Sequence, residues 1–272
     1  FGRTGALTAG THGGIVGGMS PFGITWKEGA LTKIFAGNIA ARLNNMVKYE
    51  SPDLSGFKLY AQYSNGVDDD DVVSSQKNRY IAVGATYRYK NLRLIAAFDN
   101  LFYNDSAVKT DAGVAAGKDL KDQRTYNIGG TYDFGDVRMY LGYQYGQNIK
   151  TPRQGDAKAI AAAKYDSKDS KAAEGYDTNA VTLGTKIKLF GGELNGTLGY
   201  AHAKRDFNDS KADVYQAMVG YKYPISKRTY AYGALGYIHG KSENTKLSKK
   251  VWKRTVERVN TRSMFMGLCH EF

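Results

Sequence analysis

The sequence predicts an all-β protein, a transmembrane antiparallel β-barrel, and three observations lead to this prediction. In residues 264–272 the even-numbered positions are mostly apolar, and the segment ends on the aromatic residue Phe272. Segments with the same two-residue alternation, separated by turn residues, fill most of the chain before them. No run of the 272 residues approaches the ~20 apolar residues that a membrane-spanning helix needs. A mean hydropathy of −0.48 is compatible with a barrel, in which only every second strand residue faces lipid.

Eleven alternating segments follow one another from Asn44, and each is expected to be a strand. In the segment 137–148, one face carries Val137, Met139, Leu141, Tyr143 and Tyr145, and the opposite face carries Arg138, Tyr140, Gly142, Gln144 and Gly146, so one face is apolar and the other mostly polar or small. The expected strands cover approximately 44–51, 57–66, 79–90, 92–104, 124–135, 137–148, 178–190, 193–206, 213–225, 229–242 and 259–272.

The connections between these segments alternate in length. Tight turns are expected at 52–56, 90–91, 135–136, 191–192 and 226–228, and long polar loops at roughly 67–78, 105–123, 149–177, 207–212 and 243–258. Short turns at one rim and long loops at the other are typical of bacterial outer-membrane barrels. The alternative is a water-soluble antiparallel sheet with one buried face, but no helical domain is present to cover eleven such segments.

The number of expected strands is odd, whereas single-chain bacterial barrels close with an even number. An odd count would leave backbone groups without partners in lipid. The sequence begins at Phe1 without a signal peptide or an initiator methionine. We therefore expect that a leader has been removed or that earlier strands precede Phe1, and the odd count favours the second interpretation.

The segment 42–57, which contains Asn44-Asn45 and Ser51-Pro52, resembles the general diffusion porins of Gram-negative bacteria, notably the betaproteobacterial type. The start of the chain is similar to the end of the fifth strand in that family, and the ending with Gly267 and Phe272 also fits. The resemblance implies one barrel domain over residues 1–272, sixteen-stranded when intact, with about eleven strands present here. It also implies that residues 4–43 are the constriction loop folded into the lumen, and that the intact protein is a homotrimer.

The function implied by this resemblance is passive diffusion of small hydrophilic solutes and ions across the outer membrane, without an enzymatic activity or a cofactor. The implied partners are outer-membrane lipid and lipopolysaccharide. One alternative is a substrate-specific channel or surface receptor on the same barrel, which a lumenal ladder of aromatic residues would favour. Tyr60, Tyr80 and Tyr140 are candidates, but they do not make such a ladder. A barrel enzyme is the other alternative, and no serine stands in a nucleophile-elbow pattern.

The strongest candidates for function are basic residues whose strand positions direct them into the lumen, because rings of like charge decide which ions pass a pore. They are Lys48, Lys58, Arg88, Arg93, Arg138, Lys186 and Lys188. The constriction loop adds Lys27, Lys33 and Arg42 against the single acidic residue Glu28, and Pro21 and Phe22 lie at its expected tip. We therefore expect a preference for anions. Cys269 and Glu271 stand where the family commonly has basic residues, and alternation directs both toward the lumen.

Other patterns carry weaker expectations. The net charge of +12 does not indicate nucleic acid binding, because the basic residues are spread over many strands. The glycines of 10–18 lack the Gly-Lys-Ser/Thr ending of a phosphate loop, and the four histidines have no metal-ligand spacing, so no metal site is expected. The acidic run 68–71 is expected to be a solvated loop. The basic stretch 241–258 is either a solvated loop or a site for lipopolysaccharide phosphates, and Phe272 resembles the family's assembly signal.

Overall fold

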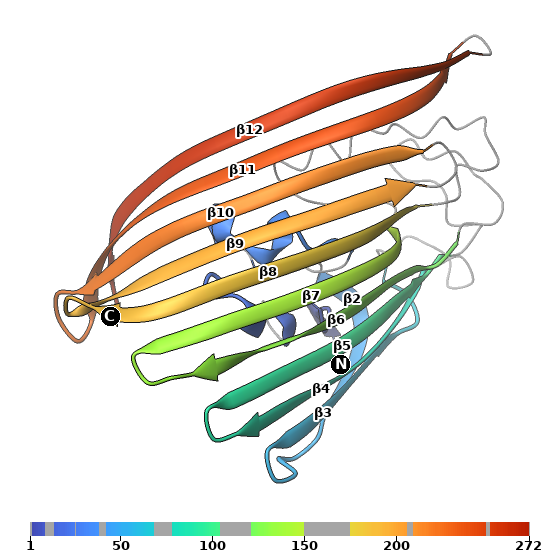
Figure 1. The fold of residues 1–272 in the computed structure, drawn as a ribbon. Helices are drawn as coiled ribbons and strands as arrows, with labels where there is room; N and C mark the ends of the chain where they lie inside the picture. The colour runs from blue at the N-terminus through green and yellow to red at the C-terminus, as the bar shows by residue number, and fades with distance from the viewer. Residues whose placement is uncertain are drawn as a thin grey trace.

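A computed structural model describes residues 2–8, 14–24, 26–37, 42–67, 78–103, 121–149, 175–205, 209–248 and 251–271. Twelve strands form one antiparallel sheet in which every strand pairs with its neighbours in the sequence (Figure 1). The strands are β1 (Gly2–Gly5), β2 (Arg42–Glu50), β3 (Phe57–Ser64), β4 (Arg79–Tyr89), β5 (Leu92–Phe102), β6 (Gln123–Asp133), β7 (Val137–Ile149), β8 (Tyr176–Leu189), β9 (Gly192–Arg205), β10 (Ser210–Pro224), β11 (Thr229–Ser248) and β12 (Val251–His270).

The sheet is strongly curved, and the segment between β1 and β2 lies on its concave side (Figure 1). This segment contains three short 3₁₀ helices, η1 (Val16–Met19), η2 (Lys27–Gly29) and η3 (Leu31–Lys33). No helix in the described ranges is long and apolar enough to cross a membrane. The all-β prediction is confirmed, and the eleven strands expected from Asn44 onward are β2 to β12.

Two connections differ most from the expected ones, and the loop expected at 207–212 is also shorter, because β10 already begins at Ser210. The tight turn expected at 191–192 is formed by Phe190 and Gly191, whose φ angles of 49° and 74° suit the left-handed turn that matches the twist of a hairpin. The loop expected over 243–258 is mostly strand, because β11 and β12 continue to pair as far as Ser248 and Val251. The many charged residues in this stretch favoured the prediction of a loop. Two paired strands can nevertheless carry charged residues on both faces where they are exposed to water.

The tight connections gather at one rim, at the lower left of Figure 1. The hairpin between β2 and β3 closes through hydrogen bonds from Leu54 N to Phe57 O at 2.7 Å and from Gly56 N to Asp53 Oδ1 at 2.7 Å. The other hairpins at this rim turn at 90–91, 134–136, 190–191 and 225–228. Most of the expected long loops, including the acidic run 68–71, lie outside the described residues.

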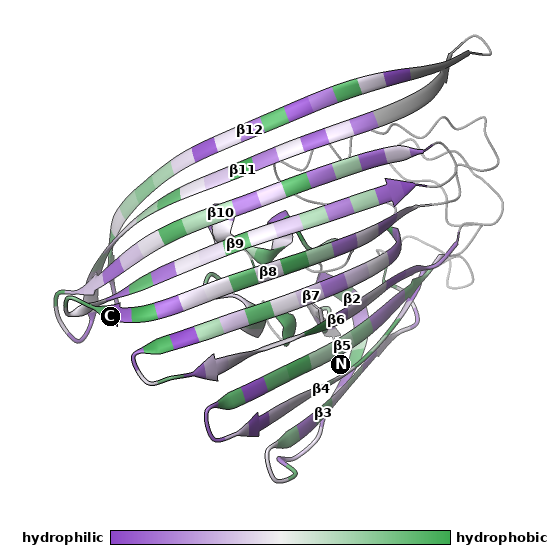
Figure 2. Cartoon of the chain, viewed as in Figure 1, coloured by the Kyte–Doolittle hydropathy of each residue, from purple (hydrophilic) through white to green (hydrophobic). Residues whose placement is uncertain are grey.

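The convex face of the sheet is apolar and exposed. Leu141 is 55% exposed, and Met266 is 71% exposed. Figure 2 shows alternating bands of hydrophilic and hydrophobic residues along several strands, such as β8 and β10. Aromatic pairs flank this face at both ends: Phe57 stacks on Tyr87 near the tight turns, and Phe98 lies 5.0 Å from Tyr126 toward the other rim. An apolar band between two aromatic girdles matches a surface that faces lipid, with its girdles at the two membrane interfaces.

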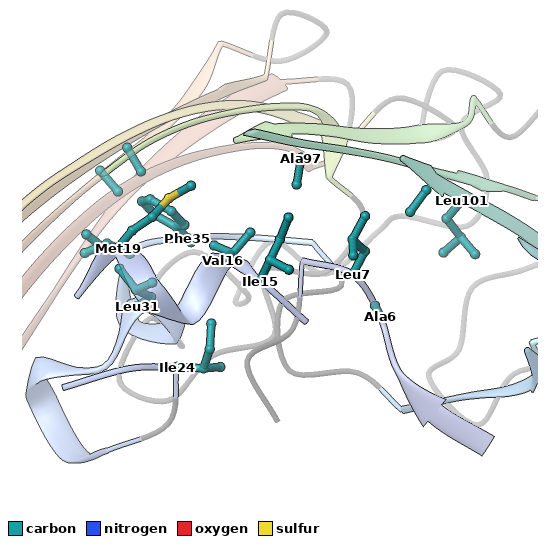
Figure 3. Close-up of a cluster of buried hydrophobic side chains, with 14 of the residues drawn as sticks. Ala6, Leu7, Ile15, Val16, Met19, Ile24, Leu31, Phe35, Ala97 and Leu101 are labelled. Carbon is teal, nitrogen blue, oxygen red and sulfur yellow. The ribbon is translucent and has the colours of Figure 1, made fainter. Parts of the chain in front are cut away.

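The concave face carries the buried core. Apolar side chains of the segment between β1 and β2 pack against the sheet, and Figure 3 shows Leu7, Ile15 and Met19 directed toward strands that include β5. Ala97 and Leu101 of β5 belong to the same cluster. The core therefore lies inside the curved sheet, between wall and segment, and not between two sheets.

Candidate functional site

The inner segment, residues 6–37, follows a track of glycines on the concave face of the sheet. An added Cβ at Gly142 of β7 would lie 3.0 Å from Met19 Cβ, and one at Gly184 of β8 would lie 2.5 Å from Pro21 Cδ. Gly84, Gly129, Gly199 and Gly236 likewise lie directly beneath side chains of the inner segment. Because glycine has no side chain, the segment can lie close to the wall along its described course.

Three buried polar side chains of the wall hold the inner segment. Asp99 of β5 accepts a hydrogen bond from Thr8 Oγ1 at 2.8 Å, and also from Tyr80 and Thr125. Gln144 of β7 accepts from Ala36 N at 2.6 Å and donates to Ala36 O at 3.3 Å.

Gln216 of β10 is the third holding point, and it donates through Nε2 to Glu28 O and, at 2.8 Å, to Ala30 O. Nearby, Gly29 N lies 2.9 Å from Met218 Sδ. The segment is therefore fixed near its start, middle and end. The sequence indicated none of these anchors, because a lone Asp or Gln in an alternating strand carries no distinguishing signal.

The strand registers settle where the candidate basic residues lie. Lys48, Lys58, Arg88, Arg93, Arg138, Lys186 and Lys188 are all on the face that carries the inner segment. Arg88 stands directly opposite Arg93, and Arg138 directly opposite Lys186. Arg42 is different: it is exposed at the start of β2, beyond an irregularity at Asn45 (φ 53°) that puts Leu43 on the buried side.

Arg88, Arg93 and Arg138 meet in one cleft of about 500 Å³, which Ser20 and Tyr140 also line. Arg93 Nε is buried and has no hydrogen-bond partner in the described part of the chain. No carboxylate among the described residues forms an ion pair with Arg88 or Arg93. The cleft thus contains guanidinium groups whose positive charge is not compensated by those residues.

Acidic partners compensate most of the other wall cations. Glu50 pairs with both Lys48 at 3.5 Å and Lys58 at 3.2 Å. Asp133 pairs with Arg138, Glu193 with Lys186 at 3.0 Å, and Asp136 with Lys188 at 3.8 Å. These carboxylates were absent from the sequence-based set. For Glu50 a signal existed, because Lys48 and Glu50 are two residues apart and therefore share a strand face.

The acidic and apolar members of the candidate site lie against the wall. Glu28 is 7% exposed and lies beside Gly236, so its carboxylate does not face open space. Phe22 stacks on Trp26 with ring centroids 5.4 Å apart, and Lys27 Nζ lies 4.6 Å from the centroid of the Phe265 ring.

The last strand directs Cys269 to the concave face, the face of Gly267 and Phe265. Cys269 is a free thiol. Phe272, the expected assembly signal, lies outside the described residues. Within the described ranges, no group of three or more His, Cys, Asp or Glu side chains is placed to hold a metal ion.

Comparisons with known proteins agree with this architecture. The family model for Gram-negative porins matches residues 1–243. An outer membrane porin of Bordetella pertussis is 27% identical over 234 residues, which are 80% of this chain and 58% of that protein. Outer membrane porin protein 32 of Delftia acidovorans is 27% identical over 205 residues, 75% of this chain and 48% of that protein. The chain thus spans about half the length of these relatives.

Solved structures share the fold. An anion-selective porin from Comamonas acidovorans superposes with a TM-score of 0.53 at 21% identity, over 86% of this chain and 61% of that one. OmpT of Vibrio cholerae superposes with a TM-score of 0.57 at 13% identity, over 99% of this chain and 74% of that one.

Proposed function

This chain belongs to the Gram-negative porins, proteins of the outer membrane, and from that premise we propose that the whole protein is a passive diffusion channel for small hydrophilic solutes and ions. The inner segment acts as its constriction, as part of the 4–43 loop. The support for this role is the way in which glycines and the polar anchors Asp99, Gln144 and Gln216 fix the segment against the concave wall. A fixed segment narrows an aqueous lumen without closing it.

The channel prefers anions, and the observation that carries this proposal is the uncompensated pair Arg88 and Arg93. Positive groups in a narrow lumen raise the local concentration of anions. The name of the anion-selective porin from Comamonas acidovorans points the same way. Ion pairing leaves Lys48, Lys58, Arg138, Lys186 and Lys188 with a smaller share of this effect.

Two partners complete the proposal. The whole protein assembles as a homotrimer, as the family resemblance implies. Lipopolysaccharide binds at the outward-facing end of β11 and β12, where Lys241 stands opposite Arg258 and Glu243 pairs with both Lys241 at 2.6 Å and Arg254. The side chains of Lys246, Lys249, Lys250 and Lys253 lie outside the described part.

Reconstitution of the whole protein into planar bilayers tests the function. We expect stepwise, non-rectifying conductance in KCl and, under a KCl gradient, a reversal potential on the chloride side. A folded protein that adds no conductance would refute the channel, and a reversal potential on the potassium side would refute the anion preference.

A further inference from the structure

A second cleft, of about 530 Å³, lies between the tip of the inner segment and the wall formed by β9 to β12. Its lining includes Phe22, Trp26, Asn195, Lys222, Tyr230 and Tyr232. We propose that this cleft is a transit subsite for aromatic monocarboxylates, in which the ring stacks on the aromatic side chains and the carboxylate faces Lys222. The proposal rests on the diffusion-channel function and names a class of solute for it.

The aromatic wall of the cleft comes from two parts of the chain that are far apart in sequence. Phe22 and Trp26 stack with an interplanar angle of 5°, and Trp26 meets Tyr232 edge to face at 6.0 Å. Tyr230 continues the row, with its ring 6.3 Å from that of Tyr232. Such a surface offers both stacked and edge-on positions for a planar ring, which are worth ~0.5–1.5 kcal/mol beyond the burial of area.

Backbone packing fixes the inner half of this wall. An added Cβ at Gly29 would lie 2.5 Å from Phe22 Cδ2, and one at Gly220 would lie 3.5 Å from Phe22 Cε1. Phe22 is therefore held between the inner segment and β10. Rigid aromatic side chains lose little conformational entropy when a ligand binds.

The charges around the cleft select the sign of the ligand. Lys222 Nζ lies 3.8 Å from the centroid of the Tyr230 ring, beside the aromatic row. Among the described residues that line the cleft, the single carboxylate is that of Glu193, which pairs with Lys186 at 3.0 Å and accepts a hydrogen bond from Asn195 Nδ2 at 3.2 Å. The net charge of these side chains is positive, so the cleft repels an aromatic cation. An aliphatic anion would interact with the charged groups but not with the aromatic rings. A ring that bears one carboxylate uses both features.

The cleft lies on the same face of the sheet as the arginine cleft. Arg138 stands opposite Lys186, Lys186 opposite Asn195, and Glu193 opposite Lys222. At this level the wall thus changes from mostly basic residues on β4 to β8 to the aromatic residues Tyr230 and Tyr232 on β11.

The test compares two anions of the same charge and similar size, benzoate and cyclohexanecarboxylate, of which only benzoate has a π-system. Binding to the detergent-solubilised whole protein is measured by equilibrium dialysis, and transit events by current noise in planar bilayers. We expect benzoate to bind about 2- to 13-fold more tightly, which corresponds to ~0.5–1.5 kcal/mol of stacking. Trp26→Leu should reduce this ratio toward one, while Trp26→Phe, which keeps a ring, should retain most of it.

Lys222→Gln should weaken the binding of both anions and leave the ratio of their affinities unchanged. Tyr132→Leu is the matched control, because it removes an aromatic ring from the opposite face of the sheet. Equal binding of the two anions by the unaltered protein, or an unchanged ratio in a folded Trp26→Leu variant, would overturn the subsite. Conductance in KCl separates the two proposals: a protein that conducts without discriminating the anions lacks only the subsite, and one that binds benzoate without conducting refutes only the channel.

Discussion

Replacing Arg88 and Arg93 together by glutamine should remove most of the anion preference at low salt and little of it at high salt. An ion about 7 Å from one guanidinium in water gains roughly 0.6 kcal/mol. At 0.1 M salt, with a screening length of ~10 Å, about half of this remains. Each arginine then changes the anion-to-cation ratio about 2.7-fold, and the pair about 7-fold. At 1 M salt, with a screening length of ~3 Å, the same pair changes the ratio less than ~2-fold.

The assay is the reversal potential across planar bilayers of neutral lipid under KCl gradients centred near these two salt concentrations. Arg258→Gln with Arg262→Gln is the matched control, because it removes two positive charges from exposed positions on β12, outside the cleft. The reasoning fails if the Arg88/Arg93 variant keeps the reversal potential of the unaltered pore at the lower salt, or if the control shifts it equally. A shift of the same size at both salt concentrations would also contradict an electrostatic origin.

Three further outcomes test the architecture. Gly184→Val should displace Pro21, whose Cδ lies 2.5 Å from the added Cβ, and should therefore change the unitary conductance measured by single-channel recording. It should also lower the free energy of unfolding by about 1–3 kcal/mol, measured by urea unfolding in lipid vesicles. Leu141→Arg, in the middle of the lipid-facing side, should destabilise the protein by about 2–4 kcal/mol. Phe134→Arg, at a tight turn, should destabilise it by only about 0–1 kcal/mol. Equal losses of stability in the same unfolding assay would contradict the assigned membrane position. Deleting Phe272 should reduce the amount of assembled trimer in outer-membrane fractions on semi-native gels, and an undiminished trimer band would show that the last residue is not needed for assembly.

The strands were predictable because each carries its own signal, a two-residue alternation between turn residues. The turn at Phe190-Gly191 was not, since Gly191-Gly192 looked equally suitable and the register with β9 decides between them. The extension of β11 to Ser248 and the start of β12 at Val251 were also missed, because 243–258 was expected to be a loop. Lys241 and Arg258 face each other across a ladder in which strand pairing, and not side-chain burial, keeps the chain extended.

The site was less accessible to sequence reasoning, because strand neighbours bring its parts together. Alternation gives the face of Arg88 and of Arg138, but only the pairing of β4 through β7 puts them in one cleft. The contact between Trp26 and Tyr232 joins residues about two hundred positions apart, and no local pattern could indicate it.

The anchors of the inner segment also imply an order of events during folding. The bond from Thr8 to Asp99 spans 91 residues, that between Ala36 and Gln144 spans 108, and that from Gln216 to Glu28 spans 188. A contact that closes a longer loop costs more conformational entropy. Both ends of the segment, and Pro21 against Gly184 of β8, can therefore dock while β10 is still unpaired. Phe22 and residues 28–30 gain their contacts with Gly220 and Gln216 only when that strand joins the sheet. The lumen of the folding barrel thus reaches its final narrow width only when the middle of the inner segment docks on β10.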